Sequence, residues 1–571
     1  MQFTIEVNNK SIRAEKGETI LSALNRNGII IPTLCRMAEF TPTGACRMCV
    51  VEVEGRDRLV TACSAPVEEW MKIKTHSPRV IKARKTIVEL LLSNHPDDCL
   101  YCDRNLDCEL QRLSDEMQVR ERRIRGSKIK PRRDQSSPAI VRELSKCILC
   151  GRCIRVCEEV VTATSIDFIG RGRYTHVGPA MDRDFNFSSC IHCGQCVLVC
   201  PTGALHEKHY LCRGAGATQP QRRDTRNTVL PLVPYALAEE LGIKYNRDFD
   251  RLLNAALRKT GFDRVFLSGT GTDILITELT DAIISSKGNP ERKPLIVSAC
   301  PAWVKYCEQF IPEVLGMMST LKTPQQISGS IIKSVVPVGE EKPRVYTVSV
   351  TPCTAMKFEA RRDSMTRKGI SDIDTVLTVR ELARLIVLYG IDITNIDPEP
   401  ADEPMALRSS ASLLAESAGG ITESVLRSLA ARKGEKEADR PAVKKLRNTG
   451  TFRETMVTIG GESYTVAVVD GLKGLTKLRQ LIDGGAKYDM VEVMACPGGC
   501  VNGGGMLPAG SRDAVRQRTK FIWQTDDQEA VRGPEQSASV ADLYGRVFAQ
   551  CSELADKNLF HTHFGKRDVL L

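Results

Sequence analysis

The chain has 571 residues, of which 42% are hydrophobic and 26% charged, and its formal net charge is +10. This length exceeds what one hydrophobic core can organise, so we expect about four domains. The balanced composition excludes a fibrous or disordered chain, and no apolar stretch is long enough to span a bilayer. The sequence begins without a basic segment followed by an apolar one, which predicts no secretory signal. The 22 cysteines then indicate metal ligation in a reducing, cytoplasmic setting rather than disulfides.

The densest positive charge lies between Arg120 and Arg133, in the segment RERRIRGSKIKPRR. A platform for single-stranded nucleic acid would have aromatic side chains among these charges, and this segment has none. We therefore expect no nucleic-acid partner. A solvated linker, or a dock for an acidic protein, fits the segment better.

The first 30 residues predict a β-grasp domain. FTIEVN and KSIRAE are strands joined by an asparagine turn, and ETILSALNRNG is an amphipathic helix that ends at glycine. The loop that follows predicts a [2Fe–2S] cluster with the ligands Cys35, Cys46, Cys49 and Cys63. Their first gap has ten residues, whereas the plant-type spacing has four. The longer gap resembles the [2Fe–2S] domain of complex I large subunits and iron hydrogenases.

A predicted helix over 79–93 leads to His95, which Cys99, Cys102 and Cys108 follow closely. An imidazole can replace a thiolate on iron and raises the reduction potential. A lone histidine is usually a satisfied surface residue, but three cysteines directly after this one favour a [4Fe–4S] cluster with one histidine ligand. This arrangement also resembles the relays of complex I and hydrogenases.

Two further cysteine runs have the spacing Cys-x2-Cys-x2-Cys-x3-Cys, and Pro201 follows the second run. This is the signature of two-cluster ferredoxins, in which the fourth cysteine of each run binds the other cluster. The first predicted cubane has the ligands Cys147, Cys150, Cys153 and Cys200. The second has the ligands Cys190, Cys193, Cys196 and Cys157, with His192 as a shield between two of them. Structural zinc also uses Cys-x2-Cys pairs, but two complete runs leave little room for it.

From about residue 225, short apolar runs alternate with helical patterns, which predicts an α/β domain with buried strands. The predicted strands are TVLPLV, RVFLSG, KPLIVSAC, RVYTVSVTPC, SYTVAVVDG and YDMVEVMAC. Functional groups are expected where such strands end. The polar stretch from 398 to 452 predicts surface helices and loops. Cys212, Cys307 and Cys551 stand alone and are expected to be small buried side chains.

Three strand-end motifs carry four more cysteines: VSACPAW at 297–303, TPCTAMKFE at 351–359 and EVMACPGGCVNGGG at 492–505. With the cysteine sets upstream, they make nearly the whole chain resemble [FeFe]-hydrogenase catalytic subunits. The C-terminal stretches ADLYGRVF and HTHF are similar to the small-subunit segment of that family. The resemblance implies a multi-domain α+β and α/β protein. Its parts are a [2Fe–2S] domain (1–79), a one-histidine cluster domain with a basic linker (80–134), a two-cubane domain (135–209), an H-cluster domain (210–510) and a C-terminal segment (511–571).

The resemblance also implies an H-cluster, a [4Fe–4S] cubane joined to a diiron centre that carries CO, cyanide and a dithiomethylamine. Its ligands would be Cys300, Cys353, Cys496 and Cys500, with Cys500 bridging to the diiron centre. The residues around the cofactor would be Ser298, Pro301, Thr351, Pro352 and Gly504. The glycines at 503–505 are expected to let the backbone approach this bulky group. A cubane alone would need the same four cysteines, so the pattern leaves the diiron centre open.

This chain departs from the family at the residues that move protons. The family has a proton-transferring cysteine where this chain has Ala299, whose side chain can neither donate nor accept a proton. Two relay glutamates fall on Leu279 and Ala282 in the ungapped register, while Ser319 matches the relay. Glu278 and Asp281 keep the spacing of the two glutamates one position early, and we expect the usual relay to be lost.

The cyanide-binding side departs as well. The family lysine that bonds a cyanide is Met356 here, and the family methionine before the proline is Thr351. Lys357 lies one position late, which turns its side chain by about 100° on a helix. We therefore do not expect Lys357 to substitute. Upstream, Leu232 and Pro234 replace polar residues of the family.

Two functions follow from these features. The first is an enzyme that interconverts H2 with protons and electrons, slowly or with a bias, and passes electrons through one H-cluster, three accessory [4Fe–4S] clusters and one [2Fe–2S] cluster. The second is an electron-transfer or H2-sensing subunit without turnover. The partners implied are ferredoxin, or a flavoprotein that oxidises NAD(P)H together with iron–sulfur subunits, in a hetero-oligomer, and maturation proteins. A complex I large subunit would explain the N-terminal clusters but not the MACPGGC motif.

Overall fold

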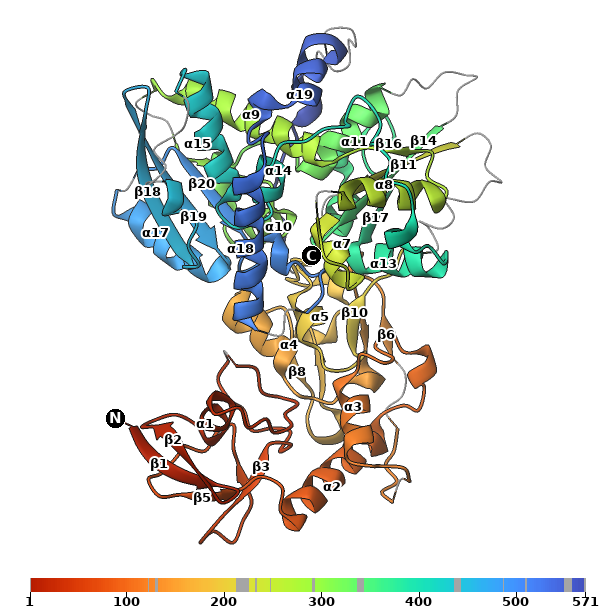
Figure 1. The fold of residues 1–571 in the computed structure, drawn as a ribbon, viewed down its shortest axis with the longest axis vertical. Helices are drawn as coiled ribbons and strands as arrows, with labels where there is room; N and C mark the ends of the chain where they lie inside the picture. Colours follow the sequence, from red (N-terminus) through yellow and green to blue (C-terminus); the bar gives the residue numbers. More distant parts are fainter. Residues whose placement is uncertain are drawn as a thin grey trace. The chain divides into compact units, whose positions relative to one another are not determined.

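The computed structural model describes residues 2–568 except 39, 122, 129–131, 212–224, 232–233, 247, 290–292, 336–343, 436–442, 486, 509–510 and 549–556 (Figure 1). The chain divides into two compact units. The first unit comprises Met1–Glu159, Thr164–Asn186 and Val199–His206. The second comprises Val160–Ala163, Phe187–Leu198 and Glu207–Leu571. Among the described residues, no helix combines the length and the apolar character needed to cross a membrane.

The first unit starts with a five-stranded mixed sheet in the order β2-β1-β5-β3-β4. Its elements are β1 (Gln2–Val7), β2 (Lys10–Glu15), α1 (Ile20–Arg26), β3 (Val50–Val53), β4 (Val60–Thr61) and β5 (Lys72–Lys74). β1 pairs antiparallel with β2 and parallel with β5. The Thr19 side chain caps α1, whose residues Ile20 and Leu24 share one buried cluster with Ile5 of β1. The two predicted strands and the helix after them are confirmed.

Two helices follow the sheet. α2 (Pro78–Asn94) confirms the helix predicted over 79–93, and the Ser77 side chain caps its first turn. Val88 of α2 packs in one cluster with Leu110 and Leu113 of α3 (Glu109–Glu116). His95 is the residue that caps the C-terminus of α2, so the helix ends directly before the segment with the predicted cluster ligands.

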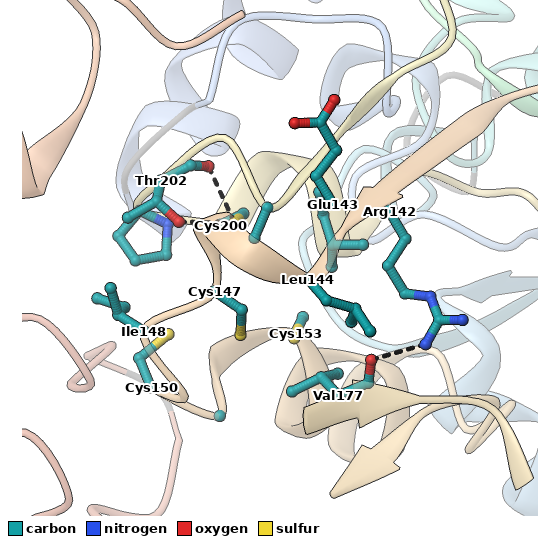
Figure 2. Close-up of a pocket in the computed structure, with 14 residues that line it drawn as sticks. Arg142, Glu143, Leu144, Cys147, Ile148, Cys150, Cys153, Val177, Cys200 and Thr202 are labelled. Atoms are coloured by element: carbon teal, nitrogen blue, oxygen red, sulfur yellow. Dashed lines mark hydrogen bonds between the residues drawn. The ribbon is translucent and has the colours of Figure 1, made fainter. Parts of the chain in front are cut away.

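The rest of the first unit is built from short elements. They are β6 (Arg133–Asp134), β7 (Ile140–Glu143), α4 (Arg152–Arg155), β8 (Asp167–Ile169), β9 (His176–Gly178) and β10 (Leu205–Glu207), whose last residue belongs to the second unit. β10, β7 and β6 form a three-stranded sheet, and β8 pairs with β9. Residues of β7, β9 and the loops around them line a pocket that contains Cys147, Cys150, Cys153 and Cys200 (Figure 2).

The second unit contains two four-stranded sheets. In the first sheet, β12 (Arg264–Val265), β11 (Thr225–Pro231), β14 (Arg344–Thr351) and β17 (Thr375–Thr378) are parallel. In the second sheet, β13 (Leu295–Ile296), β20 (Met490–Met494) and β19 (Glu462–Asp470) are parallel, and β18 (Phe452–Ile459) is an antiparallel edge. All six strands predicted in this region are confirmed, whereas β17 and β18 were not predicted.

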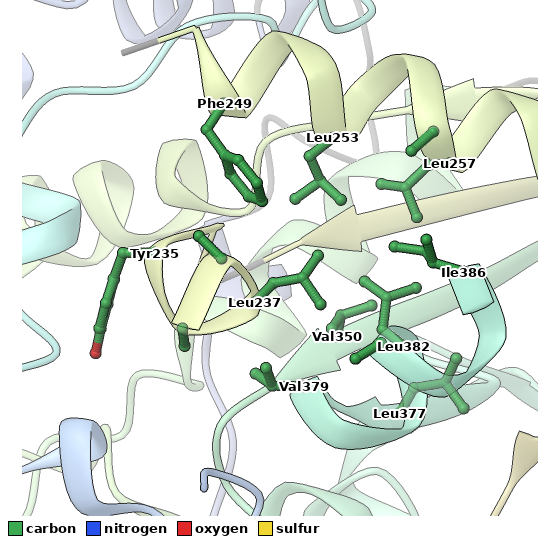
Figure 3. Close-up of a cluster of buried hydrophobic side chains, with 14 of the residues drawn as sticks. Tyr235, Leu237, Phe249, Leu253, Leu257, Val350, Leu377, Val379, Leu382 and Ile386 are labelled. Atoms are coloured by element: carbon green, nitrogen blue, oxygen red, sulfur yellow. The ribbon is translucent and has the colours of Figure 1, made fainter. Parts of the chain in front are cut away.

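The second unit also contains helices, the first of which, α5, ends one residue inside the first unit. They are α5 (Gln195–Val199), α7 (Pro234–Glu240), α8 (Phe249–Lys259), α9 (Gly269–Ser286), α10 (Pro301–Phe310), α11 (Pro324–Val335), α12 (Ala355–Glu359), α13 (Val379–Leu388), α14 (Ala411–Leu414), α15 (Gly420–Arg432), α17 (Leu475–Asp483), α18 (Arg512–Gln528) and α19 (Ala538–Asp542). Figure 3 shows how α8 (Leu253, Leu257) and α13 (Leu382, Ile386) meet around Val350 of β14. These contacts fix the position of β14, whose end leads into the TPCTAMKFE motif.

The prediction of surface helices and loops over 398–452 is wrong for its central part. α14 is buried along its whole length, and α15 is buried apart from its last residues and Arg427. Serine, threonine and glutamate made this stretch look polar, but their side chains are hydrogen-bonded inside the protein, as Ser417 is to Leu414. Buried Cys307 agrees with its prediction, while Cys212, Cys551 and Leu232 lie outside the described residues.

Candidate active site

Four cysteines of the second unit lie at the carboxyl ends of its parallel strands. Cys300 follows β13 and precedes the first residue of α10, and Cys353 follows β14 by two residues. Cys496 follows β20 by two residues, and Cys500 begins a short turn of helix. Cys353 therefore comes from one sheet and the other three from the other sheet. Functional groups meet at such strand ends in α/β folds, as the sequence predicted.

The four thiols are electrostatic neighbours. Burial raises the pKa of Cys496 well above its usual range, and Cys193, Cys353, Cys300 and Cys500 raise it further. Burial raises the pKa of Cys353 to about 12, with a contribution from Cys300. Iron binds a cysteine as the thiolate, so each thiol must lose its proton when a cluster binds. The positive charge of the iron would then offset the repulsion between the four thiolates. The donor set thus fits an iron–sulfur cluster.

Two buried polar atoms beside Cys500 extend this fit beyond the thiols. The Tyr235 hydroxyl interacts with the Glu416 carboxyl and lowers its pKa, against the larger effect of burial, which raises it well above the usual range. Both groups lie near enough to Cys500 for the charges to interact, and the carbonyl of Glu416 accepts from the Cys500 amide at 2.7 Å. This buried polar pair fits a polar cofactor next to Cys500. Sequence reasoning missed both residues because neither belongs to a cysteine motif.

The glycines after Cys500 are required by the protein's own backbone, whatever their place beside a cofactor. A Cβ at Gly503 would lie 2.3 Å from the carbonyl oxygen of Pro352, and one at Gly504 would lie 2.5 Å from that of Cys193. Both distances are shorter than any real contact, so these glycines are required by the approach of protein backbone. The Gly505 amide also donates to Pro352 at 2.8 Å. Gly504 thereby brings the MACPGGC segment against the cysteine run at 190–196.

Gln195 links the two cysteine sets of the second unit. Its side-chain amide lies 3.3 Å from Sγ of Cys496 and donates to the carbonyl of Asn502 at 2.7 Å. Gln195 stands between Cys193 and Cys196 in the sequence, and these two side chains and Cys190 are buried. No local pattern indicates this contact, because the two residues are 301 positions apart in the chain.

The two residues that replace the family's methionine and lysine contact each other. The Thr351 hydroxyl donates to Sδ of Met356 at 2.8 Å and accepts from the Cys353 amide at 3.2 Å. Lys357 instead pairs with Glu381 at 2.7 Å and donates to the carbonyl of Lys208. Its ammonium is therefore committed elsewhere, in agreement with the expectation that it does not substitute.

The two positions where the resemblance implies relay glutamates have apolar side chains. Leu279 of α9 is wholly buried, and Ala282 is partly buried. Glu278 accepts instead from the Tyr544 hydroxyl at 2.6 Å, and Asp281 pairs with Arg432. The Ser319 hydroxyl accepts from the Leu321 amide at 3.2 Å, while Ser298 donates to the Leu321 carbonyl at 2.7 Å. These polar groups are all bonded to other parts of the protein.

The predicted [2Fe–2S] ligands converge in the first unit. The Cys35 thiol is hydrogen-bonded to Cys46 and to Cys63, and these contacts hold its pKa below the usual range. Cys49 is hydrogen-bonded to Cys63. Four sulfur atoms gathered in this way fit a small cluster, although their assignment as ligands stays a prediction.

The predicted one-histidine site lies near the surface. His95 is buried, which argues against a solvated surface histidine, whereas Cys99 is exposed. Cys99 and Cys102 both raise the pKa of the Cys108 thiol after burial, so the three thiols are neighbours. The side chains beside Cys99 are unusually exposed for their type: Leu100 is 85% and Tyr101 is 88% exposed.

The first predicted cubane site is a buried group of thiols. Figure 2 shows the side chains of Cys147, Cys150, Cys153 and Cys200 around one space. Burial raises the pKa of Cys147 to about 11 and that of Cys150 to about 12, and Cys200 contributes to both shifts. For the second cubane, Cys190, Cys193 and Cys196 belong to the second unit and Cys157 to the first.

Comparison with known proteins shows the family. The chain matches the family model described as iron only hydrogenase large subunit, C-terminal domain, over residues 227–504. It is 34% identical over 585 residues to the NADP-reducing hydrogenase subunit HndD of Solidesulfovibrio fructosivorans, with 100% of both chains covered. The chain belongs to the iron-only hydrogenase family. This iron-only hydrogenase is also 32% identical over 573 residues to iron hydrogenase 1 of Clostridium pasteurianum, with 99% of this chain and 100% of that protein covered.

The N-terminal part matches cluster-binding families. The matches are a 2Fe-2S iron-sulfur cluster binding domain (1–78), the NADH-ubiquinone oxidoreductase-G iron-sulfur binding region (84–123) and a 4Fe-4S dicluster domain (146–204). A solved structure of [FeFe]-hydrogenase HydA1 from Chlamydomonas reinhardtii aligns with a TM-score of 0.53 at 25% identity, covering 63% of this chain and 100% of that chain. The predicted fold class is confirmed, and the protein is an iron–sulfur oxidoreductase of the iron-hydrogenase family.

Proposed function

We propose that this iron-only hydrogenase interconverts H2 with protons and electrons, and that its turnover is slow or biased in direction. The observation that carries the proposal is the convergence of Cys300, Cys353, Cys496 and Cys500 from two sheets, next to the buried polar pair described above. These four thiols would hold the H-cluster, with Cys500 bridging to its diiron part. When bound, the H-cluster supplies an iron that polarises H2 and an amine that accepts the proton.

The residues of the chain then decide how electrons and protons leave the site. Gln195 lies against Cys496 and ties it to the run that holds Cys193, which favours electron transfer to a neighbouring cubane. From there we propose a route through the other accessory [4Fe–4S] clusters to the single [2Fe–2S] cluster. Ala299 and buried Leu279 offer no hydrogen bond to a proton. The loss of one positioned proton-transfer group lowers rates by roughly 10²–10⁴-fold.

The partner proposed is a subunit that oxidises or reduces NAD(P)H with a flavin. The support is the similarity to a protein named as a subunit of an NADP-reducing hydrogenase and the exposure of Cys99, Leu100 and Tyr101. A cluster ligand at the surface, followed by two exposed apolar side chains, fits electron exchange with another protein. Maturation proteins are required in addition, because the chain cannot itself build the diiron centre.

A second function is an electron-transfer subunit that does not turn over H2. The observation that favours it is the Thr351–Met356 contact at 2.8 Å, which engages the side chain at the position where the resemblance implies a cyanide-binding lysine. Infrared spectroscopy of the chain produced with its maturases, combined with a hydrogen assay, separates the two functions. Bands of bound CO and cyanide with measurable H2 uptake or evolution support the first function. Iron–sulfur signals without these bands support the second.

A further inference from the structure

A buried chain of two side chains leads from Cys190 to the helix that follows Cys300. Nδ1 of His192 lies 3.9 Å from Sγ of Cys190, and its Nε2 lies 2.8 Å from Nζ of Lys305 on α10. His192 is completely buried and Lys305 is 4% exposed. The His192 ring also packs against Phe358 at 4.9 Å between centroids. Both side chains are therefore held in place on more than one side.

The contact with Lys305 decides which nitrogen of His192 carries the proton. An ammonium can only donate, so Nε2 must be the acceptor. In a neutral imidazole the proton then resides on Nδ1, the atom that faces Cys190. The N–H consequently points towards the sulfur of a predicted cluster ligand. The His192 amide donates to the same sulfur at 3.4 Å.

Lys305 is also a buried positive charge without a carboxylate partner among the described residues. Glu308, the acid whose charge interacts with Lys305, is bonded to Arg362 and, at 2.8 Å, to Arg567. The Lys305 ammonium instead lies 4.6 Å from the centre of the Phe358 ring. Burial lowers the pKa of Lys305 to about 8, and Cys190 opposes that shift. The charge is thus present at neutral pH and is poorly screened.

We propose that Lys305 is a positioning residue that, through His192, raises the reduction potential of the cluster held by Cys190, Cys193 and Cys196. The inference rests on the proposed function, in which the cysteine run at 190–196 holds an accessory cluster next to the Cys496 site. Hydrogen bonds to the sulfurs of an iron–sulfur cluster and the charge around it set its potential. Reduction adds a negative charge, so a nearby ammonium stabilises the reduced form. The effect makes this cluster a better acceptor for electrons that leave the Cys496 site.

The test is a redox titration of the whole chain, followed by electron paramagnetic resonance. The signal that disappears in Cys196→Ala identifies the cluster. In Lys305→Met we expect the ratio of reduced to oxidised cluster at a fixed potential to fall about tenfold, which is about 59 mV for one electron. Lys305→Arg keeps the charge and a donor, so its ratio should stay near that of the unaltered chain. The clusters of the first unit should keep their potentials in both variants and serve as internal controls.

Three outcomes would overturn the proposal. The first is an unchanged ratio in Lys305→Met with the cluster present, which is what a purely structural lysine predicts. The second is an equal change in the Cys147 cluster, which would indicate a general disturbance. The third is the absence of the Cys190 cluster from the unaltered chain, which would remove the ligand set itself. If Lys305→Met does not fold, Lys305→Gln retains a donor without the charge and should lower the ratio less.

The path through His192 has its own test. If Lys305 acts through His192, the effect of Lys305→Met on the ratio should be clearly smaller in a His192→Phe background than in the unaltered chain. Fully additive effects would show that Lys305 does not act through His192.

Discussion

Under the proposed function, the residues that would carry electrons and those that would carry protons differ sharply in this iron-only hydrogenase. On the electron side, the thiols are complete, Gln195 lies against Cys496, and Lys305 and His192 lead to Cys190. On the proton side, the usual acids and the cysteine are replaced by Leu279, Ala282 and Ala299. An electron can pass between clusters that are merely close, whereas a proton needs every hydrogen bond on its way. The chain therefore retains the parts of a relay for electrons while its usual proton route is apolar.

The largest effect is expected from removing a thiol at the candidate active site. The unaltered, reconstituted chain should contain about 18 iron atoms before the diiron centre is added, from one [2Fe–2S] and four [4Fe–4S] clusters. Cys496→Ala should lose about four of them and all hydrogen chemistry, because a cubane needs its thiolates. Iron and sulfide analysis with a hydrogen assay measures both.

Cys307→Ala is the matched control, since Cys307 is a buried cysteine on α10 that belongs to no set. It should keep its iron content. A count of about 10 iron atoms in the unaltered chain would contradict the assignment of five clusters.

The missing proton route is tested by restoring its proton-transfer groups. Ala299→Cys alone should not restore fast turnover, because Leu279 still interrupts the route. Ala299→Cys together with Leu279→Glu and Ala282→Glu should raise hydrogen evolution by roughly 10²–10⁴-fold if the three positions form one relay. Rates of the matured variants decide this. A large gain from the single substitution would show that another relay is intact and that the ungapped register of α9 is wrong.

A smaller effect is expected from restoring the lysine that would bond a cyanide of the diiron centre. Met356→Lys would place an ammonium where Sδ of Met356 now accepts from Thr351. A charge-assisted hydrogen bond to cyanide contributes roughly 1.5–3 kcal/mol, and it favours the reduced, more negative states. Infrared-monitored redox titration should therefore show higher potentials of the diiron centre, or higher occupancy of it.

Thr351→Met is the companion variant, because it removes the same hydroxyl contact without adding a charge. It should leave the potentials nearly unchanged. An equal response of both variants would attribute the effect to the lost contact rather than to the ammonium.

The smallest effect on hydrogen chemistry is expected from Asp273 of α9. Burial raises the pKa of this carboxyl to about 7, although Ser409 opposes the shift with two hydrogen bonds. Between the unfolded value of about 3.9 and about 7, the folded state binds more protons than the unfolded state. Stability should thus fall as pH rises through this window, by at most about 1.4 kcal/mol per pH unit.

Asp273→Asn should remove this slope from the free energy of unfolding, measured by denaturant titration at several pH values. Its turnover at neutral pH should equal that of the unaltered chain, because Ser409 already occupies both carboxyl oxygens. A loss of turnover would place Asp273 on a proton route and would weaken the contrast between the two sides.

Much of the fold was predictable because its signals are local. Alternation in FTIEVN, the Ser77 cap of α2 and the apolar runs before each cysteine motif depend on neighbours in the chain. β18 was missed although its side chains alternate between buried and exposed, because it begins inside a stretch interpreted as polar loops. α15 was misjudged for the same reason, since its serines and threonines are satisfied by partners that only folding provides.

The sequence by itself determined the family, the cysteine sets and the departures at Ala299 and Met356, because spacing and residue type are properties of the chain alone. Only the tertiary structure decided what surrounds them. It brought Thr351 to Met356, Lys357 to Glu381, Gln195 to Cys496 and Lys305 to His192. Most of these contacts join segments that are far apart in the chain, and hydrogen bonds act over about 3 Å. No local pattern encodes such a distance, so the properties of the sites that depend on it emerge only when the sheets and helices pack.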